Sequence, residues 1–176
     1  VRVLVAGMVL FLVACSVQEF PNERQVDVAA GARDRVAIAA EYLQKGENER
    51  ALLHLRKAIE LDSKSAEAHN LMAILLERES DPKGAEKHYR KAIGLRDDYS
   101  QAHNNYGVFL FKRGDYQSAA SHLEKAAGDI SYQLRASAFE GLGRAALKLA
   151  ERARAENAFQ RALRIDANLP VASLEL

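Results

Sequence analysis

The hydrophobic and polar positions of this chain repeat with a period of 34 residues from position 32 onward. Units that begin at Ala32, Ala66 and Ser100 align without gaps, and a fourth begins at Ala136 after two inserted residues. Apolar residues recur within each unit at helical spacing, and no run alternates as a strand would. Each unit therefore predicts two helices joined by a short turn.

Small residues occupy three fixed places in every unit. The eighth place holds Ala39, Ala73, Gly107 and Gly143, the twentieth holds Ala51, Ala85, Ala119 and Ala155, and the twenty-seventh holds Ala58, Ala92, Ala126 and Ala162. The distance between two packed helices depends on the side chains at their contact, so small residues allow a close approach. We expect these places to mark helix crossings within and between the helix pairs.

The turn residues agree with this division. Gly46 and Gly114 suit the left-handed position that ends a helix, and Asp81 before Pro82 is typical of a helix start. The sequence thus predicts an all-α solenoid of antiparallel helix pairs, with repeats at 32–65, 66–99, 100–135 and 136–169 and the start of a fifth at 170–176. Because a solenoid end needs a cap, we expect either a missing C-terminal part or a partner that covers this end.

The period and the small residues resemble the tetratricopeptide repeat. The resemblance implies that the first helices of the units line a concave groove, with certain repeat positions facing it. Carried over to this chain, the candidate partner-binding residues are Leu43, Asn70, Ile74, Glu77, Asn104, Val108, Phe111 and Leu147. Apolar side chains beside Asn and Glu favour a groove for an apolar peptide or helix. The alternative is that one or more of them packs against the N-terminal segment or a neighbouring helix.

The first residues have the pattern of an export signal. Arg2 precedes an apolar run at 3–13, which is too short to span a bilayer core of roughly 30 Å. The stretch Leu12-Val13-Ala14-Cys15 resembles a bacterial lipobox, which implies cleavage after a signal peptide at 1–14 and acylation of Cys15, the only cysteine. Residues 15–31 are then the lipidated Cys and a tether. The alternative is that Cys15 is an ordinary small residue in a helix.

Composition and motifs argue against several function classes. The chain carries 25 Lys and Arg against 24 Asp and Glu, and the balanced charge predicts no general attraction to nucleic acid. The five His include two sets spaced by 34, which fall at equivalent places in successive repeats and so predict no metal site. No phosphate-binding loop or nucleophile motif occurs. We expect a protein that is not an enzyme and has neither a cofactor nor a small-molecule substrate.

Longer stretches carry a more specific resemblance. They include HNNYGVFLFKRGDYQSAASHLEKA and DISYQLRASAFEGLG, which begin at His103 and Asp129. These resemble the type IV pilus pilotin lipoproteins called PilF or PilW, although that family typically has six repeats. The resemblance implies a lipid-anchored protein on the periplasmic face of the outer membrane, which binds the secretin subunit and promotes its localisation and multimerisation. The alternative is a general envelope lipoprotein that serves as an adaptor for outer-membrane assembly or cell-wall enzymes.

Overall fold

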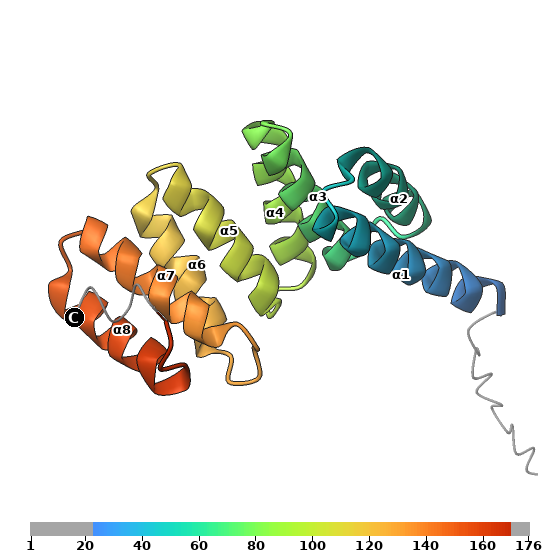
Figure 1. Cartoon of the computed structure of the whole chain (residues 1–176). Coiled ribbons are helices and arrows are strands. Elements are labelled where there is room, and N and C mark those ends of the chain that lie inside the picture. Colours follow the sequence, from blue (N-terminus) through green and yellow to red (C-terminus); the bar gives the residue numbers. More distant parts are fainter. Residues whose placement is uncertain (1–22, 170–176) are drawn as a thin grey trace, which may run out of the picture.

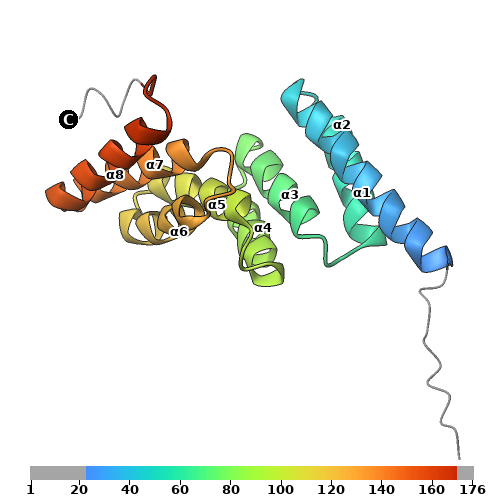
Figure 2. The ribbon, with the colours of Figure 1, turned by 90° about the horizontal axis from the view of Figure 1, so that it is seen from below.

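The computed structural model describes residues 23–169, which form eight helices and no strand. The helices are α1 (Glu23–Gln44), α2 (Asn48–Leu61), α3 (Ala66–Arg78), α4 (Pro82–Leu95), α5 (Ser100–Lys112), α6 (Tyr116–Gly128), α7 (Arg135–Lys148) and α8 (Arg152–Ile165). They follow one another as antiparallel pairs in an elongated row, with α1 and α8 at opposite ends (Figure 1; Figure 2 from below). The predicted all-α solenoid is confirmed.

The small residues lie at the helix crossings, as the sequence predicts. All twelve of them are buried. Two are glycines because the opposing side chain leaves no room for a methyl group. A Cβ at Gly107 would come within 2.7 Å of Leu123 Cγ, and one at Gly143 within 2.6 Å of the Phe159 ring.

The turns between paired helices use a left-handed residue in all four repeats. Gly46 and Gly114 have φ of 75° and 84°, which confirms the prediction made for them. The equivalent positions in the second and fourth repeats are Ser80 and Ala150, with φ of 60° and 59°. A residue with a side chain is strained in this region by roughly 1–2 kcal/mol. The chain therefore carries local strain at two of its four turns.

The helical part of the chain begins before the first predicted repeat. Helix α1 starts at Glu23 and continues through residues 23–31, which were expected to be part of a tether. This segment contains no proline and is rich in good helix formers, and its part as a tether stays a prediction. The proposed signal peptide and Cys15 lie outside the described residues. None of the described helices is both long and apolar enough to cross a membrane.

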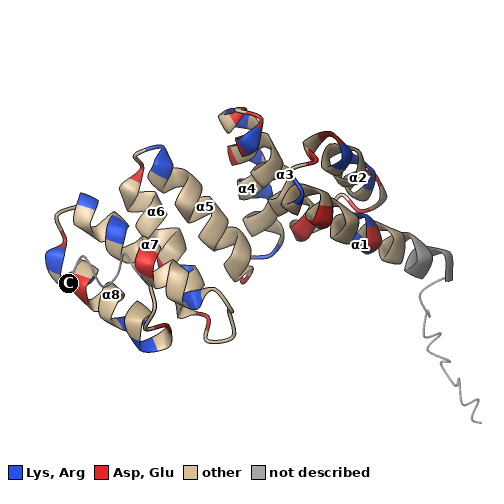
Figure 3. Ribbon diagram, viewed as in Figure 1, with Lys and Arg blue, Asp and Glu red and all other residues tan. Residues whose placement is uncertain are grey.

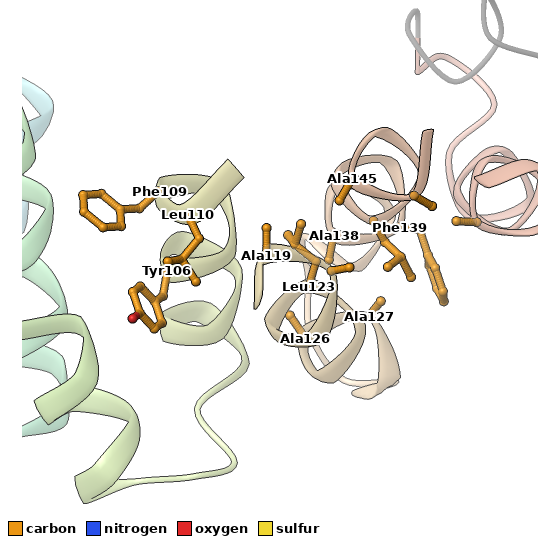
Figure 4. Close-up of a cluster of buried hydrophobic side chains, with 14 of the residues drawn as sticks. Tyr106, Phe109, Leu110, Ala119, Leu123, Ala126, Ala127, Ala138, Phe139 and Ala145 are labelled. Atoms are coloured by element: carbon orange, nitrogen blue, oxygen red, sulfur yellow. The ribbon is translucent and has the colours of Figure 1, made fainter. Parts of the chain in front are cut away.

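The buried side chains form two clusters along the row. The smaller cluster joins α1, α2 and α3 and includes Leu43, Leu55 and Leu75. The larger one runs from α3 to α8. Figure 4 shows part of it, with Tyr106 and Phe109 on one side of α5 and Leu123 on α6 facing Ala138 of α7.

Neighbouring repeats meet through different side chains at two junctions of the larger cluster. The junction between the second and third repeats, here the aromatic junction, brings Tyr89 of α4 against Tyr106 and Phe109 of α5, with ring centroids 5.5 Å from Tyr89 in both cases. The junction between the third and fourth repeats, here the alanine junction, packs Leu123 of α6 against small residues of α7. Ala138 faces Leu123, and a Cβ at Gly141 would lie 3.1 Å from Leu123 Cδ2. Ala127 of α6 and Ala145 of α7 are buried in the same cluster.

Candidate partner-binding groove

Two adjoining hollows lie along the face made by the first helices of the repeats. The larger hollow, of ≈ 490 Å³, is lined by Ile74, Glu77, Arg78, Tyr89, Asn105, Val108 and Lys112. The smaller one, of ≈ 50 Å³, is lined by Val108, Phe111, Leu123, Gly141 and Arg144. Val108 lines both and is 38% exposed, so it connects them into one surface. We call the two hollows together the groove.

Glu77 forms a fixed polar wall in the larger hollow. Its carboxylate accepts a hydrogen bond from Lys112 Nζ at 2.7 Å and one from the Tyr89 hydroxyl at 3.2 Å. Burial, followed by the nearby Glu77 charge, raises the pKa of Tyr89 far above its usual value, so this phenol stays neutral and donates. Because three helices contribute to the bonds, the wall holds its shape without a ligand.

Arg144 gives the smaller hollow a positive rim. Its guanidinium carbon lies 5.1 Å from the centre of the Phe111 ring, a favourable cation–π arrangement. None of the ion pairs formed by the described residues involves Arg144. The smaller hollow therefore presents an apolar floor beside an uncompensated positive charge.

The structure brings some of the predicted residues together. Ile74, Glu77 and Val108 line the larger hollow, and Phe111 joins Val108 in the smaller one. Leu147 is 37% exposed on α7, one helical turn beyond Arg144, but it lines neither hollow. The part that these residues play in binding stays a prediction.

Three of the predicted residues are buried. Leu43, Asn70 and Asn104 are only 4%, 0% and 9% exposed. Leu43 is buried in the cluster that joins α1 to α3, which is the alternative left open above. Asn70 Oδ1 accepts a hydrogen bond from Asn105 Nδ2 at 3.2 Å, so it links α3 to α5. Contrary to the expectation, these three buried side chains do not line the groove.

Sequence reasoning missed several lining residues, among them Tyr89 and Asn105. Tyr89 comes from a second helix and reaches the groove because it is large and sits at the aromatic junction. Asn105 follows the predicted Asn104 by one residue, and the helix rotation turns Asn105 rather than Asn104 toward the hollow. The adjacent Asn residues at this point of the third repeat were the available signal.

Four of the histidines form two equivalent pairs, which the spacing of 34 residues did not predict. His69 and His88 bring their Nδ1 atoms to 2.9 Å, and so do His103 and His122. Nε2 of His69 and of His103 lies within hydrogen-bond distance of a backbone carbonyl. Burial first, and the partner His second, lowers the pKa of His88 and of His122 to about 4. Both pairs are therefore neutral at pH 7, with one proton shared between facing nitrogens.

No group of three or more metal-ligating side chains forms within the described part of the chain. A wider cavity, of ≈ 990 Å³, lies at the edge of the row between the α4–α5 and α6–α7 loops. Tyr99 and Tyr132 line it, and the buried Tyr132 hydroxyl has no hydrogen-bond partner. None of the residues predicted to bind a partner lines this cavity, and the two-residue insertion before the fourth repeat was the only sequence signal for it.

Known proteins share the repeat pattern and the fold of this chain. Models of the tetratricopeptide repeat family match residues 39–79, 70–139 and 136–169. The type IV pilus assembly protein PilF of Pseudomonas aeruginosa is 35% identical over 146 residues, which cover 82% of this chain. A solved structure of Pseudomonas aeruginosa PilF matches 85% of this chain and 67% of its own, with a TM-score of 0.81. The chain belongs to the PilF family of tetratricopeptide-repeat proteins.

The predicted resemblance to this family is thereby confirmed. The match covers 58% of the curated PilF, so the chain spans less than two thirds of that relative. PilW, described as a widely conserved type IV pilus biogenesis factor, is 23% identical and has a TM-score of 0.74 over 80% of this chain and 64% of PilW. MamA is 24% identical with a TM-score of 0.65 over 76% of this chain and 77% of its own. The likeness to PilW and MamA shows the shared repeat fold.

Proposed function

We propose that this chain is a type IV pilus biogenesis factor that binds the secretin subunit through the groove and promotes its placement and multimerisation at the outer membrane. Membership of the PilF family supports the role in pilus biogenesis. The secretin as partner and the outer membrane as location rest on the sequence resemblance described above. In this proposal the protein acts by binding and performs no chemical step.

The observation that carries the proposal is an apolar surface held open by fixed polar contacts. Val108 and Leu147 are more than a third exposed, and Phe111 is only partly buried. They lie on successive first helices, α5 and α7, beside Glu77 and Arg144. An amphipathic partner segment could bury its apolar side chains on this surface and place polar groups against these two charges.

The N-terminal segment explains how binding would promote assembly. Acylation of Cys15 would confine the groove to the membrane surface, and a groove-bound secretin subunit would share that confinement. Subunits held in one layer meet at a higher effective concentration than free subunits do. Binding and anchoring together therefore suffice to favour a multimer.

The direct test replaces the exposed apolar surface with charge. Val108→Glu combined with Leu147→Glu should weaken binding of the purified secretin subunit by more than tenfold, because two carboxylates would have to be desolvated against apolar groups. Calorimetric titration measures the affinity, and circular dichroism verifies that the helices remain folded.

Leu53→Glu is the matched control. Leu53 is 67% exposed on the second helix α2, so its substitution adds a charge to an exposed apolar position outside the groove. Affinity should be unchanged in this variant. Equal binding by all three proteins would show that the secretin uses another surface, and absence of binding by the wild type would point to the general envelope adaptor.

A further inference from the structure

A further cavity, of ≈ 170 Å³, lies between α6, α7 and α8 and shares no residue with the groove. Three of its lining residues are arginines, Arg135, Arg154 and Arg161, and Phe139 and Asn157 also line it. This end of the chain is basic: residues 135–169 contain seven Lys and Arg and four Asp and Glu. Figure 3 shows basic segments recurring along α7 and α8.

The charge of one of the three arginines is balanced within the protein. Arg154 contacts Glu124 at 2.9 Å and Glu151 at 2.8 Å, and Glu124 is the one carboxylate that lines the cavity. Arg154 therefore closes one wall, and its group of one arginine and two glutamates carries no positive charge.

The other two arginines have no carboxylate within ion-pair distance among the described residues. Asp129, which lies near Arg135, instead accepts hydrogen bonds from Ser100 and Ser131. Arg135 and Arg161 thus remain without an ion-pair partner at the cavity.

Both of these guanidinium groups lie over one aromatic ring. Their central carbons lie 5.3 Å (Arg135) and 4.8 Å (Arg161) from the centre of the same Phe139 ring. Arg135 Nε also donates a hydrogen bond to the Ala127 carbonyl oxygen at 2.8 Å, which leaves its two terminal nitrogens available to a ligand. A guanidinium fork fixed before binding loses less entropy when it forms paired hydrogen bonds to oxygen.

We propose that this cavity binds a phosphoryl oxyanion. A phosphate monoester carries about −1.5 to −2 charges at pH 7, which matches the two arginines without an ion-pair partner. A volume of ≈ 170 Å³ equals that of about five or six water molecules at roughly 30 Å³ each, enough for a phosphoryl group with its waters. The group could belong to free phosphate or to a lipid headgroup, whose phosphodiester has two unesterified oxygens and a single negative charge.

The test is a titration of the full chain with inorganic phosphate, followed by the amide and arginine NMR signals. Chloride at equal ionic strength separates specific binding from screening. We expect saturable shifts with phosphate only. Arg161→Gln and Arg135→Gln should each weaken phosphate binding about tenfold, because each removes a charge-assisted contact.

Two further variants distinguish a site from a general charge effect. Arg164→Gln removes an exposed arginine of the same helix that does not line the cavity, so it should bind phosphate as the wild type does. Arg161→Lys keeps the charge but loses the fork, and it should bind with an affinity between those of the wild type and Arg161→Gln. Equal shifts with chloride, or unchanged binding in Arg161→Gln, would overturn the proposal.

A second titration identifies the source of the group. Glycerophosphoglycerol, the soluble headgroup of phosphatidylglycerol, is compared with inorganic phosphate on the wild type and on Arg161→Gln. Tighter binding of the headgroup assigns the cavity to a lipid surface, and tighter binding of inorganic phosphate assigns it to the free ion. In either case, Arg161→Gln must weaken binding of whichever ligand binds the wild type more tightly. Unchanged binding of that ligand would overturn the proposal.

Discussion

The aromatic junction and the alanine junction join repeats of the same backbone design, yet they leave very different spaces. At the aromatic junction, Tyr89 and Phe109 meet ring to ring, and the adjoining hollow measures ≈ 490 Å³. At the alanine junction, small side chains such as Ala138 let α6 and α7 pack closely, and the adjoining hollow measures ≈ 50 Å³. The hollow on the first-helix face is therefore larger beside the junction of bulky side chains than beside the junction of small ones.

The largest effect is expected where the aromatic junction is emptied. Phe109→Ala should lower the free energy of unfolding by about 3–5 kcal/mol, because Phe109 is 2% exposed and packs on two tyrosine rings. Urea denaturation measures the loss. Gln101→Ala, at an exposed position of the same helix, should change stability by less than about 0.5 kcal/mol. A small loss in Phe109→Ala would mean that the rings are not the main contact.

The alanine junction should be broken by the opposite change. Ala138 is fully buried between α6 and α7, so Ala138→Leu should destabilise the protein by about 1–3 kcal/mol through overpacking. The neighbouring Ser137→Leu adds the same volume at an exposed position and should be nearly neutral. If Ala138→Leu were tolerated as well as Ser137→Leu, the close packing of this junction would be disproved.

Acid should destabilise the second and third repeats more than the fourth. Folding lowers the pKa of His88 and His122 from 6.5 to about 4, so the unfolded chain binds more protons between these values. The stabilisation is therefore complete above pH 6.5 and is lost as the pH falls toward 4, by up to about 1.4 kcal/mol per pH unit for each proton. Denaturant midpoints measured at several pH values report this slope.

The fourth repeat supplies the control for this pH effect. Its residues at the places of the third-repeat pair are Phe139 and Ala158. Exchanging the pair for these residues, His103→Phe with His122→Ala, should flatten the stability profile between pH 6.5 and pH 4. The ring centres of His122 and Tyr106 lie 4.7 Å apart, so the double substitution can also change the stability at neutral pH. The quantity compared is therefore the slope of stability against pH. An unaltered slope would assign the acid effect to other groups.

The smallest effect is expected at the turns. Ala150→Gly should stabilise the protein by about 0.5–1 kcal/mol, because glycine adopts φ of 59° without strain although it costs entropy in the unfolded chain. Gly114→Ala is the reverse test in the third repeat and should destabilise by a similar amount. Thermal unfolding monitored by circular dichroism measures both, and a destabilising Ala150→Gly would contradict the assignment of strain.

The sequence predicted best the features that steric exclusion requires at the same place in each repeat. The buried alanines and glycines could be identified because close helix crossings exclude larger side chains at the same places. Gly46 and Gly114 were recognisable for a similar reason, since few residues adopt positive φ. Ser80 and Ala150 have no such signature and were found only in the structure.

The groove was predicted less well because exposure depends on how neighbouring helices cover each other. Repeat position alone placed Leu43 and Asn70 beside Val108, but adjacent helices bury the first two. The histidine pairs were missed because the period of 34 relates equivalent positions in different repeats. Each pair instead joins the two helices of one repeat. A spacing of 19 residues, shared by His69 with His88 and by His103 with His122, was the signal that could have revealed them.

The proposed function is tested most directly by the state of the secretin in a strain that lacks this gene. The multimer is detected as a high-mass band on an unboiled gel, after complementation with the wild type, with the Val108→Glu, Leu147→Glu variant or with Leu53→Glu. We expect the band to be lost in the deletion strain and restored by the wild type and Leu53→Glu, but not by the groove variant. An undiminished band in the deletion strain, or equal restoration by the groove variant, would contradict it.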